Sequence, residues 1–239
     1  MKKLLKNIVL CFMVIGFLLG TYLIGSGYLL YRTSISKISI EEKVTSLRES
    51  EDYVELKDIS KDFLNGIVAV EDHRFYKHGG IDYISLGRAV VSNLRAGEIV
   101  MGGSTISQQL AKNLFFTNEQ KFERKIAELF VVNRLEEKYS KDEILELYVN
   151  EIYYGDGNWG IKNASEGYFG KAPKEINFDE AVLLAGLPQA PDYYALSKNY
   201  EGAEARSQIV ISAMIKNNYV SRDLVEEVYE ESLYRFVEQ

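Results

Sequence analysis

The chain begins with an uncharged apolar segment that is long enough to cross a membrane. Residues 7–31 form a run of 25 positions without a charged side chain, and thirteen of them are Leu, Ile, Val or Phe. An α-helix rises about 1.5 Å per residue, so this run exceeds the roughly 30 Å hydrocarbon core of a bilayer. The sequence therefore predicts a transmembrane helix, followed by a chain that folds separately from it.

The charges beside this segment predict its orientation. Three lysines lie among residues 1–6, whereas only Arg32 follows the segment closely. Because positively charged flanks stay in the cytoplasm, we expect residues 1–6 to form a cytoplasmic tail and the later chain to lie on the extracytoplasmic face of the cell membrane. The alternative is a cleaved signal peptide, which has a shorter apolar core and ends in small residues such as Ala-x-Ala. The first alanine is Ala69, so we favour a retained, single-pass anchor.

The composition indicates a folded globular domain after the anchor. The chain of 239 residues is 46% hydrophobic and has only three prolines, which argues against a disordered or fibrous protein. Its net charge of −7 argues against nucleic acid as a partner. Cys11 is the only cysteine, so no internal disulfide is expected, and the cysteine content does not identify the compartment.

Helical periodicity dominates the sequence after residue 57. Apolar residues recur every three to four positions, whereas alternating strand patterns are scarce. Capping residues mark helix starts, among them Asp82 and Ser140. We expect an almost all-α domain over residues 58–239, preceded by a polar stalk over residues 32–57. Helices are expected over residues 82–96, 104–116, 122–135, 140–150, 161–169, 177–187, 201–217 and 221–236.

The first candidate for chemistry is Glu71, at the end of an apolar helical face. A partly desolvated carboxylate there has a raised pKa and is suited to accept a proton, although a solvated helix-end acid is the plain alternative. Asp72 adds a second charge or an orienting acceptor. His73 and His78 follow at a spacing that suits one helix face poorly, and no cysteine accompanies them, so a zinc site is disfavoured.

The second candidate is residues 102–113, where a Gly-Gly pair precedes a run of Ser, Thr and Gln. Glycines allow close backbone approach, and a helix N-terminus presents free N–H groups to an anion. Because a helix this polar makes a poor core, we expect its surface to face a ligand or water. Lys112 follows Gln109 by three positions and can reach a phosphate from that surface. A merely solvated amphipathic helix is the alternative.

The third candidate is the group of Arg124, Lys125 and Glu128. Arg124 and Glu128 are four residues apart and so share a helix face. A surface ion pair there contributes less than about 1 kcal/mol. The functional interpretation has both cations on a pyrophosphate, because arginine binds phosphate through two parallel donors. Glu128 would then orient a cation, a water molecule or the leaving group.

Five sequence blocks, taken in order, resemble the family 51 peptidoglycan glycosyltransferases, and most closely the monofunctional biosynthetic peptidoglycan transglycosylases. The resemblance covers about residues 55–220, and its blocks are residues 71–82, 102–113, 124–128, 141–150 and 180–191. Ser107 stands where threonine is usual, and Val149 where leucine is usual. Ala195 and Leu196 follow Tyr194 where the family commonly has proline, which leaves the conformation of that loop open.

The resemblance implies a lysozyme-like α fold and a polymerising reaction. The growing glycan, linked to undecaprenyl pyrophosphate, would be the donor, and the C4 hydroxyl of lipid II would attack it with inversion to a β-1,4 link. Glu71 would be the catalytic base and Glu128 the second catalytic residue. The sequence requires no cofactor, but Mg²⁺ or Mn²⁺ at Glu128 is a candidate, because hard cations prefer oxygen ligands.

The resemblance also implies the substrate-binding residues and the partners. Lys112, Arg124 and Lys125 would neutralise the departing pyrophosphate. The full expected substrate-binding set is Asp72, Phe75, His78, Thr105, Gln109, Lys112, Asn113, Arg124 and Lys125. The expected partners are lipid II, the growing glycan strand, the lipid bilayer and the cell-wall synthesis machinery.

Two other classes of function remain open at this point. A lysozyme-like muramidase or lytic enzyme shares the α fold and a key glutamate, but it acts on finished glycan and does not need the three cations. A catalytically dead scaffold is the other class, and the intact acids Glu71 and Glu128 argue against it. Release of muropeptides from finished cell wall would identify the muramidase.

Overall fold

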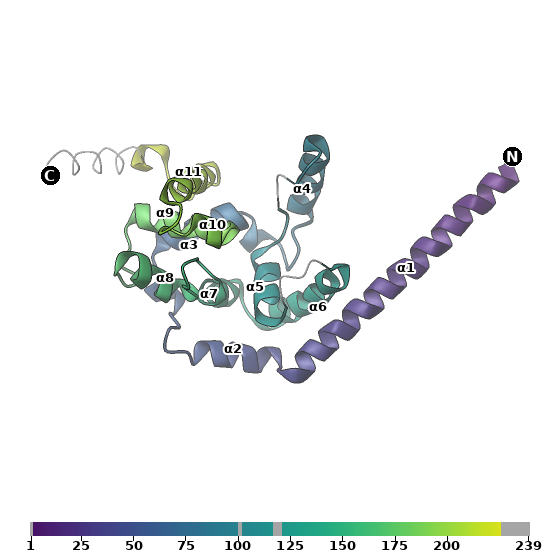
Figure 1. The fold of residues 1–239 in the computed structure, drawn as a ribbon, viewed down its shortest axis with the longest axis horizontal. Coiled ribbons are helices and arrows are strands. Elements are labelled where there is room, and N and C mark those ends of the chain that lie inside the picture. The colour runs from purple at the N-terminus through teal and green to yellow at the C-terminus, as the bar shows by residue number, and fades with distance from the viewer. Residues whose placement is uncertain (1, 100–101, 117–120, 226–239) are drawn as a thin grey trace.

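The computed structural model describes residues 2–99, 102–116 and 121–225 (Figure 1). Every regular element within these ranges is a helix, and an isolated bridge between Tyr153 and Trp159 is the β-type pairing found there. The prediction of an all-α, lysozyme-like domain behind a long apolar N-terminal helix is confirmed.

The N-terminal helix α1 (Lys2–Lys37) projects from the rest of the molecule (Figure 1). Within the described ranges, it is the helix long and apolar enough to cross a membrane, with a mean hydropathy of 2.4 in its most apolar window. The predicted anchor at residues 7–31 lies inside it. Its orientation in a membrane stays a prediction.

The C-terminal end of α1 packs against α6 (Phe122–Lys138). The ring of Tyr31 stacks on Phe130 at 5.4 Å between centroids, and Tyr31 is buried. Gly27 faces Ile126 so closely that an added Cβ would lie 2.6 Å from the Ile126 Cβ. Only glycine permits this approach, so α1 is fixed to the domain by a close helix–helix contact.

The segment predicted as a stalk, residues 32–57, contains helix α2 (Ile40–Arg48) and the start of the short helix η1 (Leu56–Asp58). Ser39 caps α2 through a capping box with Glu42. Ile40 and Val44 are buried, and α2 packs on α7 (Lys141–Glu151). This segment therefore contributes to the hydrophobic core.

The core consists of two groups of helices. In the first, α3 (Lys61–Glu71), α9 (Phe178–Gly186) and α11 (Tyr200–Lys216) pack together. In the second, α5 (Ile106–Phe115) packs against α6 and α7. The remaining elements are α4 (Tyr83–Ala96), α8 (Gly160–Phe169), α10 (Pro191–Tyr194), η2 (Phe75–Lys77) and η3 (Leu187–Gln189).

Helix ends follow the capping signals in the sequence. The Asp82 carboxylate accepts the first N–H groups of α4, and Gly97 ends that helix with a φ of 72°. Thr105 and Ser140 form capping boxes at the starts of α5 and α7. Most of the helix expected over residues 221–236 lies outside the described residues.

One sequence expectation about α5 is wrong. Ser107 and Gln108 are buried, with exposed fractions of 0% and 6%, although a helix this polar was expected to face a ligand or water. The buried polar groups find protein partners instead. Ser107 Oγ donates to Glu136, and Gln108 Oε1 accepts from the Thr105 N–H at 3.0 Å. Because these hydrogen bonds offset the loss of water, α5 packs in the interior.

Candidate active site

Glu71 is the last residue of α3, and its side chain is held from two other helices. Gln109 Nε2, on α5, donates to Glu71 Oε2 at 2.7 Å. The hydroxyl of Tyr148, on α7, donates to Gln109 Oε1 at 3.0 Å. Tyr148 is fully buried, so this chain of hydrogen bonds fixes the amide, which in turn fixes the carboxylate.

Arg206 approaches the other oxygen of the same carboxylate. Its Nη2 atom lies 3.8 Å from Glu71 Oε1, and the two side chains are only 10% and 12% exposed. The sequence prediction missed Arg206. The available signal was its place on the same helical face as Val210 and Met214, where a charge is unusual unless it is paired.

The surroundings of Glu71 act on its pKa in opposite directions. Burial raises the pKa most strongly, and the adjacent Asp72 raises it further. The hydrogen bond from Gln109 and the positive charges of Arg206 and Lys112 lower it. The net pKa is raised, which makes the carboxylate a better proton acceptor than an exposed glutamate.

Asp72 ties the end of α3 to the start of α5. Its Oδ2 atom accepts from the Ile106 N–H at 3.1 Å, and its Oδ1 atom lies 2.8 Å from His78 Nε2. Burial raises the pKa of Asp72, and the contact with His78 opposes this. Phe75, which lies in the segment after Asp72, is fully buried. Asp72, Phe75 and His78 thus position the backbone around Glu71.

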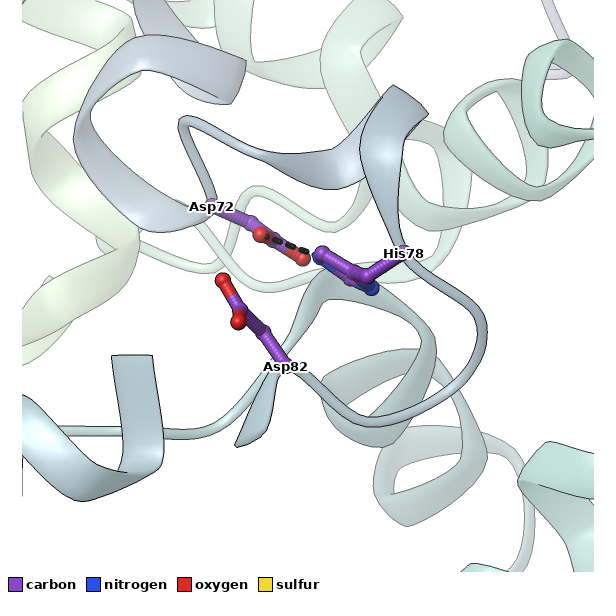
Figure 2. Close-up of side chains that lie close together, drawn as sticks. All are labelled: Asp72, His78 and Asp82. Carbon is purple, nitrogen blue, oxygen red and sulfur yellow. Dashed lines mark hydrogen bonds and ion pairs between the residues drawn. The ribbon is translucent and has the colours of Figure 1, made fainter. Parts of the chain in front are cut away.

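Asp72, His78 and Asp82 lie close enough together to hold a metal ion, as far as distance alone is concerned (Figure 2). Their candidate ligand atoms all lie within 4.8 Å of one another. Both Asp82 oxygens, however, accept hydrogen bonds at the start of α4, and Asp82 Oδ2 also lies 3.0 Å from Arg74 Nε. Since Arg74 already neutralises the charge, the group fits a structural network better than a metal site.

Glu128 is the centre of a second charged group, on α6. Its side chain is 1% exposed, Arg124 Nη1 pairs with its Oε1, and Lys125 Nζ lies 3.0 Å from its Oε2, without hydrogen-bond alignment. Lys125 Nζ also donates to Ser104 Oγ at 3.2 Å. Because the Glu128 carboxylate is buried, although Lys125 is 43% exposed, this is not the surface ion pair considered as the plain alternative. The acid holds the two cations next to each other.

Lys112 connects the two acids electrostatically. Burial lowers its pKa most strongly, while the charges of Glu128 and Glu71 raise it. Within the described part of the chain, its ammonium group makes no hydrogen bond or ion pair, so its donors are available to a ligand. Asn113 follows on α5 and is half-buried.

A cavity of about 380 Å³ opens beside Glu71. It is bounded by the end of α3, by α4, by α11 and by residues 102–105, and Arg206 and Ser104 both line it. Ser104 also touches Lys125, so the base candidate and the cations lie beside the same loop. Thr105 lines the cavity and donates to the Gly80 carbonyl at 2.7 Å, which fixes that loop.

Comparison with known proteins identifies the domain. The sequence profile of the transglycosylase family matches residues 39–215, which is most of the chain. The chain belongs to the transglycosylase family. The match begins just before α2 and ends within α11, so the transglycosylase domain includes the segment that precedes Glu71 as well as the helix that carries Arg206.

Curated relatives of this transglycosylase domain are larger proteins. Penicillin-binding protein 1A of Aquifex aeolicus is 43% identical over 77% of this chain and 26% of the relative. Penicillin-binding protein 1F of Bacillus subtilis is 41% identical over 85% of this chain and 29% of the relative. Penicillin-binding protein 1A of Streptococcus oralis is 33% identical over 94% of this chain and 38% of the relative. The chain thus spans roughly a quarter to two fifths of the length of these relatives.

Some of the predicted site residues lie around Glu71 and Glu128, and others hold the surrounding backbone in place. Glu71 lines the cavity, Gln109 donates to the Glu71 carboxylate, and Lys112 interacts electrostatically with both Glu71 and Glu128. Arg124, Lys125 and Glu128 form the cation network. Asp72, Phe75, His78 and Thr105 hold the backbone that surrounds them. The catalytic and binding roles of all these residues stay predictions.

Proposed function

We propose that this transglycosylase domain polymerises lipid II into β-1,4-linked glycan strands and releases undecaprenyl pyrophosphate. The observation that carries the proposal is that two charged groups lie beside the same loop, residues 102–105. One is Glu71, a largely buried carboxylate with a raised pKa, and the other is the cation network around Glu128. Sugar transfer from a phosphate leaving group needs both a proton acceptor and positive charge.

Glu71 is the general base of the proposed reaction. The C4 hydroxyl of the lipid II GlcNAc passes its proton to the Glu71 carboxylate while its oxygen forms a bond to MurNAc C1 of the growing strand. The bond from C1 to the phosphate oxygen breaks, and its electron pair leaves with the diphosphate. Attack opposite the leaving group converts the α-linked phosphate into a β-glycosidic bond. Proton transfer of this kind accelerates reactions roughly 10²- to 10⁴-fold.

The cations stabilise the leaving diphosphate in this proposal. Lys112 supplies an ammonium group that no described residue pairs with, while Arg124 and Lys125 are held by Glu128. Fixed charges in a partly buried site need no rearrangement when negative charge develops. Glu128 thus acts by arranging the cations, and its role in the reaction is indirect.

The surroundings of Glu128 fit a divalent cation poorly. Both carboxylate oxygens already face a cation, and the side chain is almost completely buried. We therefore take no step of the reaction through Mg²⁺ or Mn²⁺. The polymerisation rate in the presence of a chelator tests this choice, and it should equal the rate in its absence.

The apolar helix α1 suits the proposed substrate, which is itself confined to a bilayer. An enzyme anchored in the same membrane meets its substrate at a high effective concentration. We propose a single-pass protein with a cytoplasmic N-terminus and its transglycosylase domain on the extracytoplasmic face. The bilayer, the glycan strand and the cell-wall synthesis machinery are its proposed partners.

Two substrates test the proposed function against the muramidase alternative. The full chain, reconstituted in lipid vesicles, is incubated either with lipid II or with finished peptidoglycan. We expect glycan strands from lipid II and no soluble fragments from finished peptidoglycan. Release of muropeptides from finished peptidoglycan without polymer formation would overturn the proposal.

A further inference from the structure

Arg206 is a buried cation whose nearest acidic partner is the proposed base. Its guanidinium lies 3.8 Å from Glu71 Oε1, and its Nε atom donates to the Gly186 carbonyl at 3.4 Å. Its aliphatic stem packs on Gly186, where an added Cβ would lie 2.9 Å from Arg206 Cγ. Because residue 186 has no side chain, the arginine has room to extend from α11 to the cavity in this conformation.

The Glu71 carboxylate is thereby held at both oxygens. Gln109 donates to Oε2 from α5, and Arg206 approaches Oε1 from α11. The two contacts come from the two separate groups of core helices, so the carboxylate lies where these groups meet. A carboxylate fixed in this way cannot rotate freely to form other contacts.

We propose that Arg206 is a positioning residue that keeps the Glu71 carboxylate ionised and aimed into the cavity. This inference rests on the proposed role of Glu71 as the base. Arg206 is not itself required to touch the transferred proton. It acts through Glu71, by placing a fixed positive charge against the oxygen that Gln109 leaves free.

Among the described residues, Arg206 is the cation that lies within ion-pair distance of Glu71. The titratable groups that act on Glu71 are Asp72 beside it, Lys112 on α5, Tyr148 on α7 and Arg206 on α11. Among the cations, Arg206 lowers the pKa of Glu71 more than Lys112 does, and the pKa of Lys112 is itself raised more by Glu128 than by Glu71. Tyr194, on α10, is the other group that acts on Arg206. His73, Arg88 and Lys216 line the same cavity.

Removing Arg206 should lower the ionised fraction of Glu71, and with it the rate, most at low pH. Burial of Glu71 favours its neutral form, and the guanidinium opposes this. Without the guanidinium, a higher pH is needed to ionise the carboxylate, so the acid limb of the pH–rate profile moves to higher pH. A residue with only a packing role would instead lower the rate by the same factor at every pH.

The test is the pH dependence of lipid II polymerisation by the full chain in vesicles, at saturating substrate. For Arg206→Met, we expect kcat at about pH 6 to fall roughly tenfold relative to the wild type, and to recover most of that loss by about pH 9. Arg206→Lys retains the charge, so its profile should stay close to that of the wild type. A kcat for Arg206→Met that is lowered equally at all pH values overturns the proposal.

Arg48→Met is a matched control. It also removes an arginine from a glutamate, since Arg48 Nη2 lies 2.9 Å from Glu143 Oε1, but this pair is remote from Glu71 and much more exposed. We expect its pH–rate profile to have the wild-type shape. A shift in Arg48→Met as large as in Arg206→Met would mean that the effect is not specific to Glu71, which contradicts the proposal.

Thermal unfolding supplies a second test that does not need activity. At alkaline pH, where Glu71 is ionised, replacing Arg206 by Met or Gln should lower Tm more in the wild type than in Glu71→Gln, because the neutral side chain offers no charge to pair with. Equal losses of Tm in both backgrounds would contradict the pairing. If the wild type polymerises no lipid II, the proposed function fails, whereas this unfolding comparison still decides whether Arg206 stabilises ionised Glu71.

Discussion

At the level of single residues, the chemistry of Glu71 depends on groups that are remote in sequence. Its carboxylate meets Gln109 and Arg206, and Gln109 is oriented by Tyr148. The sequence predicted Glu71 and Gln109 because both belong to recognisable blocks. Arg206 and Tyr148 were not among the predicted site residues, since a three-dimensional fold is needed to bring four helices to one carboxylate.

Lys112 provides a prediction at this scale. Because its ammonium group interacts with both acids and has no direct partner among the described residues, we expect it to bind the diphosphate in the transition state. Lys112→Met should lower kcat for lipid II polymerisation roughly 10²-fold, the usual loss when one fixed donor to developing charge is removed. Initial rates at saturating lipid II measure this effect.

Lys198→Met is the matched control for Lys112, because Lys198 is exposed on another part of the domain. Its kcat should equal that of the wild type. An unchanged kcat for Lys112→Met would contradict the proposal that Lys112 binds the leaving diphosphate.

At the level of helices, capping signals predicted the boundaries well. Asp82 and Ser140 each cap a helix as expected, and Thr105 caps α5 close to the expected start at residue 104. Their side chains bond to the first free N–H groups whatever the tertiary environment. The burial of α5 was not predictable in this way. Its hydroxyl and amide groups are satisfied by Glu136 and by the helix's own cap, which are specific partners that a polarity pattern does not show.

Asp82 provides a prediction about helix α4 and pH. Burial acts to raise its pKa, but hydrogen bonds from Ser85 and Ile84, with Arg74 beside it, lower the pKa from 3.8 to about 2. A carboxyl whose folded-state pKa is depressed stabilises the fold above its unfolded-state pKa and loses this contribution as pH falls through the folded value. The wild type should therefore lose about 1–2 kcal/mol of unfolding free energy from this group between about pH 4 and 2.

Asp82→Asn should lack this part of the acid-induced loss, although it is less stable than the wild type at neutral pH. Urea unfolding of the detergent-solubilised full chain across that pH range measures the difference. Glu137→Gln, which removes an exposed carboxylate paired with Arg134, should keep the wild-type pH dependence. Identical slopes in the wild type and Asp82→Asn would contradict the assignment.

At the level of the whole molecule, the anchor and the catalytic domain form a continuous structure. The predicted transmembrane segment ends at residue 31, yet Gly27 and Tyr31 already pack on α6. The same helix carries Arg124 and Glu128, so the contact connects the anchor directly to the cation network. The sequence predicted the apolar helix from its length, but not this contact, because a single glycine does not reveal its neighbour.

Gly27 provides a prediction at this scale. Gly27→Leu should force α1 away from Ile126, because a Cβ at this position has no room. We expect a loss of roughly 1–3 kcal/mol of stability from overpacking, together with a reduced polymerisation rate in vesicles, since the anchor no longer holds α6 in place. Gly20→Leu is the control, because nothing lies within 4 Å of an added Cβ there. Equal Tm and rate in the two variants would show that the contact has no influence.

The most direct test of the account is the rate at which Glu71→Gln polymerises lipid II in vesicles, compared with Glu137→Gln, which alters an exposed glutamate on α6. The glutamine retains the size of the side chain but cannot accept the hydroxyl proton. We predict that Glu71→Gln remains folded, as judged by thermal unfolding, and loses at least about 10²-fold in kcat, while Glu137→Gln matches the wild type. A folded Glu71→Gln enzyme that polymerises lipid II at a rate close to that of the wild type would contradict the assignment of Glu71 as the base.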